Sequence, residues 1–194
     1  MKNIISGIML FAVLTVITGI IYPLLVTGVS QVMFPEKAQG SLVRLEGAAI
    51  GSDLIAQKFS SPAYFWPRPS ASDYQTVPSA ASNLGPTSAG LKQIIEDRKR
   101  ELAPYFSGPV PAELLLASGS GLDPELSPED ALSQVAHVAK ARGLSQVDQD
   151  RLIALVKENT ESPQFHIFGQ ARVKVLRLNL ALDAMFGRSQ GGGN

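Results

Sequence analysis

From Asn3 to Pro35 the chain carries no charged side chain, and this run limits the fold more than any other feature. Within it, Ile4–Val26 is apolar apart from small or hydroxylated positions. A helix needs about 20 such residues to cross a hydrocarbon core roughly 30 Å thick. The sequence therefore predicts an N-terminal transmembrane anchor helix over residues 1–33.

A cleaved secretory signal is the alternative interpretation of this run. Such signals have an apolar stretch of about 7–15 residues behind a clearly basic start. The stretch here is longer, and only Lys2 and the terminal amine precede it, so we expect a retained anchor. Charge bias does not fix its orientation, because Lys37 and Arg44 on the other flank balance these two charges.

The composition excludes several classes of partner and chemistry. Lysine plus arginine equals aspartate plus glutamate at 17 each, which gives no reason to expect a nucleic-acid partner. Cysteine is absent, so disulfides, thiol nucleophiles and thiolate metal sites are excluded. The rest of the chain suits one soluble domain over residues 34–187. Residues 188–194 are polar and glycine-rich, and we expect a disordered tail there.

The first half of the predicted domain reads as short strands followed by a loop. Glycines at 40, 47 and 51 punctuate one or two short strands, and residues 53–59 suit a single helical turn or a short helix. Residues 60–86 are rich in serine, alanine and proline, which is typical of a linker. Aromatic residues within them, Tyr64 to Trp66 and Tyr74, favour an ordered loop that packs or recognises something.

The second half shows helices with readable ends. One begins near Thr87 or Ser88 and ends before Pro104. A second runs from the cap Ser127 to Gly143, and a third from the cap Ser145 to Asn159. Residues 171–176 alternate like a half-buried strand, and a last helix from about residue 178 ends at Gly187. The fold class predicted is mixed α+β, with several capped helices and a small sheet.

The motifs of common enzymes are missing. His137 and His166 are the only histidines, and neither has a partner at metal-ligand spacing. The chain has neither a phosphate-binding P-loop nor the Asp-Lys-Thr-Gly of P-type pumps. Residues 118–121 (SGSG) suit a tight turn, with an anion-binding nest as the alternative. We therefore predict no catalytic, metal or cofactor site in this chain.

Several short blocks of the sequence together carry a resemblance to one known family. They cover nearly the whole chain, and their order and spacing carry the resemblance. The blocks are Tyr22-Pro23-Leu24, Thr27-Gly28, Phe34-Pro35, Gly40-Ser41-Leu42, Gly51-Ser52, Tyr64-Phe65, Arg68-Pro69-Ser70-Ala71, Tyr74, Ser82-Asn83-Leu84-Gly85-Pro86, SGSGLDP at 118–124, Ala141-Arg142-Gly143-Leu144, Arg172-Val173 and Leu178-Asn179-Leu180-Ala181-Leu182-Asp183.

In these blocks the chain resembles the C subunit of the bacterial Kdp-type potassium-transporting ATPase. The resemblance implies an accessory, non-hydrolysing subunit of a potassium uptake complex. Its partners would be a channel-like potassium-binding subunit, a P-type ATP-hydrolysing subunit and a small membrane peptide. ATP and K⁺ would be handled by those partners. The N-terminus would be cytoplasmic and the domain external, at the bacterial inner membrane. Similar proteins are described as aiding assembly and as raising the ATP affinity of the hydrolysing subunit, a role called catalytic chaperone.

Residues of the anchor and of the aromatic loop are the predicted partner contacts. Tyr64, Phe65 and Trp66 offer amphipathic area, and Arg68, held extended by its flanking prolines, suits a carboxylate across an interface. Equally open is that these residues close the domain's own core. The predicted contact set is Tyr22, Pro23, Thr27, Gly28, Tyr64, Phe65, Trp66, Arg68, Ser70, Tyr74 and Asn83.

Two other functions stay open on the sequence. A membrane-tethered external hydrolase with a serine nucleophile and a lysine base needs no histidine. A tethered module that binds an external solute is the other, and an apolar pocket with convergent polar groups would mark it.

Overall fold

A computed structural model describes residues 2–189 of the chain. Its contacts divide the chain into two compact units, one up to Ser52 and the other from Asp53 onward. Each unit is described by itself below. The boundary expected between residues 33 and 34 rests on composition and stays a prediction. Of the expected tail, residues 190–194 lie outside the described residues.

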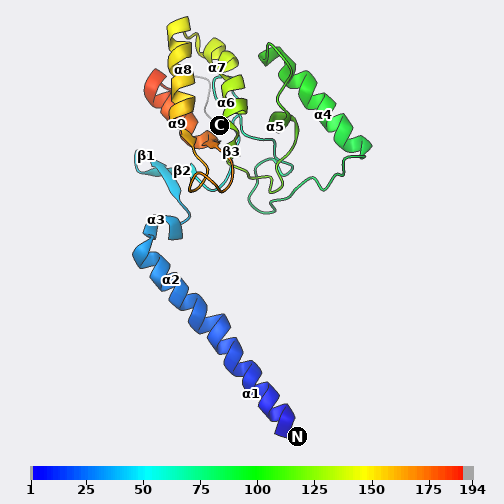
Figure 1. Ribbon diagram of the computed structural model, residues 1–194, viewed down its shortest axis with the longest axis vertical. Coiled ribbons are helices and arrows are strands. Elements are labelled where there is room, and N and C mark those ends of the chain that lie inside the picture. The colour runs from blue at the N-terminus through cyan, green and yellow to red at the C-terminus, as the bar shows by residue number, and fades with distance from the viewer. Residues whose placement is uncertain (1, 190–194) are drawn as a thin grey trace. The chain divides into compact units, whose positions relative to one another are not determined.

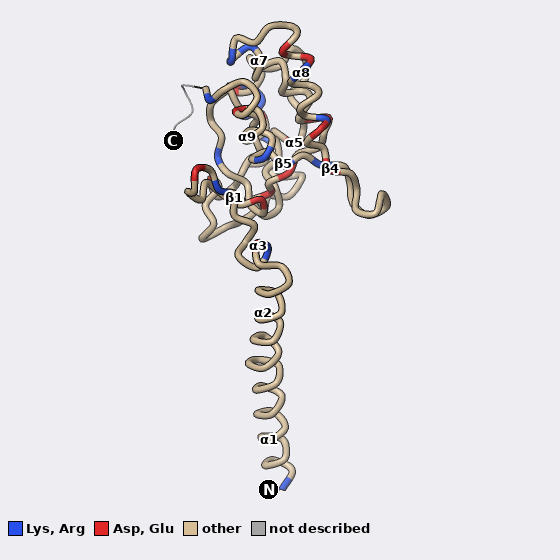
Figure 2. Tube along the Cα trace, turned by 90° about the vertical axis from the view of Figure 1, so that its left-hand side faces the viewer, with Lys and Arg blue, Asp and Glu red and all other residues tan. Residues whose placement is uncertain are grey.

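The first unit begins with one continuous helix, from Lys2 to Met33, that is long and apolar enough to cross a membrane. It consists of α1 (Lys2–Val16), the π-helical turn η1 (Ile17–Ile21) and α2 (Tyr22–Met33). At 1.5 Å per residue, its 32 residues span about 48 Å. None of its residues is buried within the chain, and Figure 2 shows charge on it only at its N-terminal end. By length and composition, this is a candidate membrane span, as the sequence predicts.

The π-helical turn lies directly before Pro23. Proline lacks an N–H, and in a regular α-helix its ring would clash with the carbonyl four residues earlier, that of Gly19. The chain relieves this by widening the turn, so that the Tyr22 N–H bonds the Ile17 carbonyl five residues back. The helix therefore passes Pro23 through a π-bulge and stays continuous.

The first unit ends in a β-hairpin. After the short helix α3 (Pro35–Ala38), strands β1 (Leu42–Leu45) and β2 (Ala48–Ser52) pair antiparallel. The turn places Glu46 and Gly47 at φ 52° and 85°, the two left-handed positions that a tight hairpin turn requires. The short strands that the glycine spacing predicts are confirmed.

The second unit packs a helical layer against a small antiparallel sheet. The sheet has β5 (Arg172–Lys174) between β3 (Glu125–Leu126) and β4 (Thr160–Glu161). Figure 1 shows the helices α6 (Pro128–Ser133), α7 (Val135–Arg142), α8 (Gln146–Glu158) and α9 (Val175–Phe186) gathered on one side of the unit. The core between these elements is formed by fully buried side chains, among them Leu126, Val138, Leu152, Val156, Val173, Leu178 and Leu182.

The helix ends follow the predicted capping residues. The hydroxyls of Ser88, Ser127 and Ser145 each accept a backbone N–H three residues on, as N-caps do. Gly143 ends α7 in the left-handed conformation with φ 65°. One helix was expected from residue 128 to 142, but the structure divides it at Gln134 into α6 and α7.

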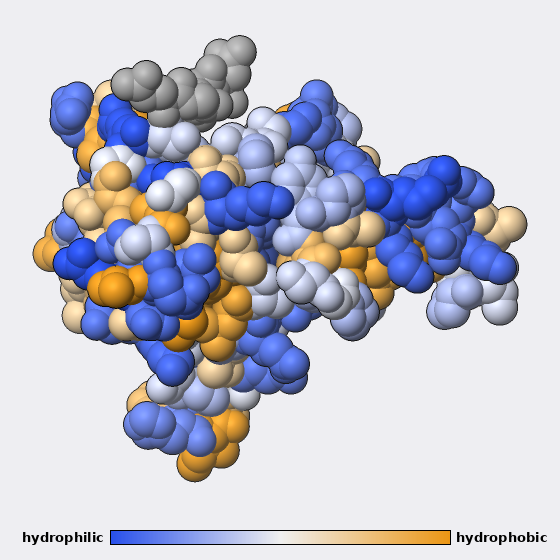
Figure 3. Space-filling view, turned by 90° about the horizontal axis from the view of Figure 1, so that it is seen from above, coloured by the Kyte–Doolittle hydropathy of each residue, from blue (hydrophilic) through white to orange (hydrophobic). Residues whose placement is uncertain are grey.

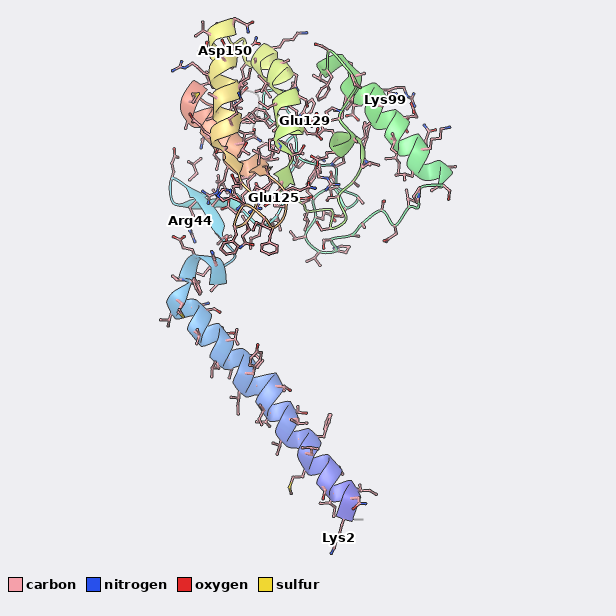
Figure 4. The ribbon with its side chains drawn as sticks, viewed as in Figure 1. Lys2, Arg44, Lys99, Glu125, Glu129 and Asp150 are labelled. Atoms are coloured by element: carbon pink, nitrogen blue, oxygen red, sulfur yellow. The ribbon has the colours of Figure 1, made fainter. Side chains whose placement is uncertain are left out.

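Helix α4 (Ala89–Leu102) carries a run of charged residues, 96–101, that is mostly exposed to solvent. It continues into the 3₁₀ turn η2 (Ala103–Tyr105) and is linked to α5 (Ala112–Leu115) by a 2.8 Å bond from Arg98 Nη1 to the Leu115 carbonyl. Seen from above in Figure 3, the lobe that α4 forms at the right is largely hydrophilic. Figure 4 shows Lys99 projecting from this helix. None of its residues is buried.

Two local predictions are wrong. Residues 53–59 form no helix, because their backbone makes tertiary bonds: the Ala56 N–H donates to the Leu122 carbonyl at 2.9 Å. The strand expected at 171–176 stops at Lys174, and α9 already begins at Val175. Val175 and Leu176 are consecutive and both buried, which a strand with one wet face cannot achieve but a helix can.

Candidate interaction site

The aromatic loop is held by two buried side-chain carboxamides, each of which bonds both the backbone N–H and the backbone carbonyl of one loop residue. Asn179 of α9 accepts the Phe65 N–H and donates to the Phe65 carbonyl, both at 2.9 Å. Gln134, between α6 and α7, does the same for Trp66, at 2.8 Å and 3.1 Å. Both carboxamides are almost fully buried. An extended segment without a strand partner thus has its backbone groups satisfied inside the domain.

Tyr64 belongs to a buried ionic cluster next to this clamp. Arg142 of α7 lies over the Tyr64 ring at 4.8 Å and pairs with Asp183 of α9 at 2.7 Å. The same guanidinium donates to the Ala63 and Gly187 carbonyls at 2.7 Å and 2.8 Å. Tyr64 Oη donates to the other Asp183 oxygen, and burial, followed by Asp183, raises the pKa of this phenol. The cluster joins the loop, α7 and α9.

Trp66 lies on an aromatic stack centred on His137. The two rings are stacked with centroids 4.3 Å apart, and Tyr105 meets Trp66 edge-on at 5.0 Å. His137 is 4% exposed, and neither of its ring nitrogens makes a well-formed hydrogen bond within the described residues. Burial lowers the pKa of His137 to about 4, although the Tyr64 backbone raises it in part. The ring is therefore neutral at physiological pH and forms one wall of an open hollow of about 540 Å³.

The low pKa of His137 predicts a loss of stability in acid. Between pH 6.5 and about 4 the unfolded chain binds a proton on this residue and the folded chain does not. The free energy of unfolding should therefore fall by about 3 kcal/mol as pH drops through this window, and should be unaffected above it. A His137→Phe variant should lose this dependence. Urea unfolding between pH 7 and pH 4, followed by the fluorescence of Trp66, measures both curves.

The comparison with His137→Phe is needed because Asp130 acts in the opposite direction. Burial, followed by the neighbouring Glu113 carboxylate, raises the pKa of Asp130 to about 6. The folded chain therefore takes up that proton first, and this carboxyl adds stability as pH falls below about 6. Asp130 is unchanged in the variant, so the difference between the two curves isolates His137. Parallel curves for the two proteins would contradict the assignment.

Arg68 pairs with a carboxylate of its own chain. Its Nη1 lies 2.9 Å from Asp123, a residue of the 118–124 block, and the pair is about one quarter exposed. The other Asp123 oxygen accepts the Glu125 N–H at 3.1 Å, which fixes the carboxylate at the start of β3. The carboxylate expected across an interface is thus present within the chain.

Ser70 and Tyr74 fold the segment after Arg68 into a compact turn. Ser70 Oγ accepts the Tyr74 N–H at 2.9 Å, and Tyr74 Oη donates to the Arg68 carbonyl at 2.9 Å. Burial raises the pKa of Tyr74 to about 12, so its hydroxyl stays a donor. The turn packs against Gly121, where a Cβ would lie 2.7 Å from the Ala80 carbonyl. Only glycine fits there.

The serine–glycine stretch is a tight turn, the interpretation that its composition favours. Gly121 N–H donates to the Ser118 carbonyl, at a φ of 72°. The next amides, of Leu122 and Asp123, donate to the hydroxyls of Ser120 and Ser118. These donors are occupied from within the turn, so nothing here favours an anion-binding nest.

The predicted contact residues lie in three places. Phe65 is fully buried and Tyr64 is 7% exposed, so both belong to the domain's own core, the alternative that the sequence left open. Trp66, Arg68, Ser70 and Tyr74 are half-buried, and Asn83 is exposed. The other members of the set, all exposed, lie in α2: Tyr22, Pro23, Thr27 and Gly28. Contact of any of them with a partner stays a prediction.

Sequence reasoning assigned no role to the residues that hold the loop. Asn179, Asp183, Arg142 and Asp123 all stand within the blocks that carried the family resemblance, and Gln134 does not. For Asn179 and Asp183, a polar side chain among the apolar residues of the last helix was the only local signal. Among the described residues, no group of three or more His, Cys, Asp or Glu is placed to hold a metal ion. The expectation of no bound cofactor is untested.

Comparison with known proteins connects this geometry to one family. A family profile described as "K+-transporting ATPase, c chain" matches residues 4–184. The KdpC subunit of the potassium-transporting ATPase of Rhodospirillum rubrum is 50% identical over 191 residues, covering 96% of this chain and 97% of that protein. This chain belongs to the KdpC family. The KdpC subunits of Methylococcus capsulatus and Polaromonas naphthalenivorans are 47% and 45% identical, over 92% and 95% of this chain and 96% of each relative.

These matches confirm the predicted family. They cover the apolar helix as well as the domain, since the profile begins at residue 4. They do not favour the tethered hydrolase or the solute-binding module that the sequence left open.

Proposed function

We propose that this chain is an accessory, non-hydrolysing subunit of a high-affinity, ATP-driven potassium uptake complex. One observation carries the proposal: this chain is 50% identical, over 96% of its length, to a protein named as the KdpC subunit of a potassium-transporting ATPase. The extent of the match includes the apolar helix, so it supports a membrane-embedded role for the whole chain. The chain would aid assembly and stability of the complex.

In this proposal the N-terminus is cytoplasmic and the domain lies outside the bacterial inner membrane, in the periplasm. The partners are a channel-like potassium-binding subunit, a P-type ATP-hydrolysing subunit and a small membrane peptide. The candidate span at Lys2–Met33 supports the single-pass arrangement. Arg68, Trp66 and Tyr74, half-buried on one loop, and Tyr22 to Gly28 on α2 are the surfaces through which we expect contact.

ATP and K⁺ are handled by the partner subunits, and the chain acts on ATP at a distance. A periplasmic domain cannot touch a nucleotide bound in the cytoplasm. Any effect on ATP affinity is therefore a coupling free energy transmitted through the membrane subunits, of about 1–3 kcal/mol. The role is that of a catalytic chaperone, which binds no ATP itself.

The complex assembled with and without this chain tests the proposal. We expect removal of the chain to raise the apparent KM for ATP about 5-fold or more, since 1–3 kcal/mol corresponds to about 5- to 150-fold. The purified chain alone should neither hydrolyse ATP nor react with an active-site-directed serine probe. An unchanged KM for ATP in an intact complex that lacks the chain would contradict the chaperone role. Labelling of the purified chain by the serine probe would support the hydrolase hypothesis instead.

A further inference from the structure

The loop between β4 and β5 presents large apolar side chains to solvent. Phe165 is 78% exposed, Ile167 76% and Phe168 65%, all within four consecutive residues. Residues 162–171, named here the Phe165 loop, include no lysine, arginine, aspartate or glutamate. Figure 2 shows this segment leaving the domain beyond β4 as a projecting loop without charge along it. Isolated exposed apolar residues are ordinary, but such a cluster on one projection marks an interaction site.

The tip of the Phe165 loop is fixed by its own backbone. Gln164 and Phe168 exchange hydrogen bonds at 2.8 Å and 2.9 Å, and the Ile167 N–H donates to the Gln164 carbonyl at 3.2 Å. These bonds fix the backbone of the turn before any partner arrives. The apolar side chains are presented on a preformed turn, which lowers the entropy that binding must remove.

Phe165 and His166 occupy backbone positions that suit other residues better. Both have positive φ, 54° and 60°, and a turn with two such positions favours Asn-Gly. The bulky Phe165 strains the backbone of the free chain there, whereas histidine adopts this region more readily than most residues. An exposed apolar side chain at a strained position adds little to the stability of the chain's own fold. Its contribution is therefore to an interaction with another molecule.

The charges around the Phe165 loop favour a protein partner over a lipid surface. Arg172, which follows the loop, pairs with Glu125 at 3.0 Å and Glu161 at 2.9 Å. Lys174 lies 3.5 Å from Glu161. The two cations that follow the loop in sequence are therefore already neutralised within the sheet, and the tip carries no lysine or arginine for anionic lipid headgroups. A rigid, uncharged apolar tip fits an uncharged apolar pocket.

We propose that the Phe165 loop inserts Phe165, Ile167 and Phe168 into an apolar, uncharged pocket on another subunit of the complex. This inference rests on the proposed function, which supplies that subunit. The loop is an anchor of the assembly, in which apolar side chains at the centre of a contact carry most of the binding. The half-buried aromatic loop around Trp66 is a separate surface.

Complexes purified through a tag on the full-length chain test this anchor. We expect a Phe165→Ser/Phe168→Ser variant to release the other subunits at least tenfold faster on dilution than the unmodified chain. Val147→Ser, at a position on α8 that is 70% exposed, is the matched control and should release them at the unmodified rate. Equal release rates for all three proteins would overturn the proposal. If the unmodified chain itself retains no subunits, the proposed function has failed rather than the anchor.

A second variant separates binding from folding. Phe165→Asn/His166→Gly places the favoured residues at the strained turn, so it should raise the melting temperature of the free chain while releasing the subunits faster. Faster release with a lowered melting temperature would indicate a merely structural loop and overturn the proposal. Benzoylphenylalanine in place of Ile167 identifies the occupant on irradiation. A crosslink to a subunit of the complex supports the proposal, whereas crosslinks to lipid alone, or none, overturn it.

Discussion

Replacing Asn179 by leucine should remove about 3–5 kcal/mol from the free energy of unfolding. Leucine keeps the approximate volume of the side chain but leaves the Phe65 N–H and carbonyl without partners in the core. Each buried backbone group that loses its partner costs about 1–3 kcal/mol. A domain has only about 5–15 kcal/mol in total, so this loss is a large share. Urea unfolding of the full chain in detergent, followed by the fluorescence of Trp66, the only tryptophan, measures it.

Gln134→Leu and Gln146→Leu complete this experiment. Gln134 makes the same pair of bonds to Trp66, so Gln134→Leu should lower the free energy of unfolding by a similar amount. Because the two amides hold adjacent residues of one segment, the double variant should cost less than the sum of the single ones. Gln146 is exposed at the start of α8, and its replacement should change stability by less than about 0.5 kcal/mol. If Asn179→Leu behaved like Gln146→Leu, the carboxamide clamp would have no energetic role.

The parts of the fold that local sequence patterns determine were predictable. Ser127 with Pro128 and Asp130, and Ser145 with Asp148, are capping patterns contained within four residues, and both caps form as expected. The apolar run of the anchor needs no information from the rest of the chain. An element can be predicted from its own sequence where the residues that determine it are all close together in the chain.

Contacts between distant residues account for the failures. Gln134 interrupts the expected helix because its side chain bonds Trp66, 68 residues earlier. Residues 53–59 lose their helical turn to a bond between Ala56 and Leu122, and to the pairing of Asp53 with Arg177, whose Nε lies 2.8 Å from Oδ2. No local sequence pattern shows which distant residue a buried polar group will bond. Asn179 and Phe65 are 114 positions apart, so the pairing of the clamp was invisible from the sequence.

The aromatic loop is ambiguous from the sequence because its composition suits two different environments. A run of Tyr64, Phe65 and Trp66 among prolines has the composition of an interface and of a core edge alike. The structure separates these residues by their depth, since Phe65 is fully buried while Trp66 is half-buried and stacked on His137. The apolar Phe165 loop had no such competing role. It was overlooked because it lies between two short strands and carries no charge or motif.

Arg142→Met should destabilise the domain by about 3–5 kcal/mol. The substitution keeps most of the apolar stem, but it leaves Asp183 without its cation and two backbone carbonyls, of Ala63 and Gly187, without their donor. The side chain of Arg142 is 5% exposed, and removing one partner of a buried pair leaves an uncompensated charge. Arg142→Lys keeps the charge but not the branched donors, so it should recover only part of the loss. Urea unfolding measures each variant.

If the unpaired Asp183 carboxylate causes the loss of stability in Arg142→Met, removing that charge should restore part of it. Arg142→Met/Asp183→Asn should therefore be more stable than Arg142→Met alone, because no unpaired carboxylate remains in the cluster. Arg151→Met tests an exposed pair of the same kind. Arg151 lies 3.4 Å from Asp148 with 63% of its side chain exposed, so its loss should cost less than about 1 kcal/mol. If the Asp183→Asn change gave no recovery, the cost of Arg142→Met would come from the unpaired carbonyls of Ala63 and Gly187 and from lost packing against the Tyr64 ring, rather than from buried charge.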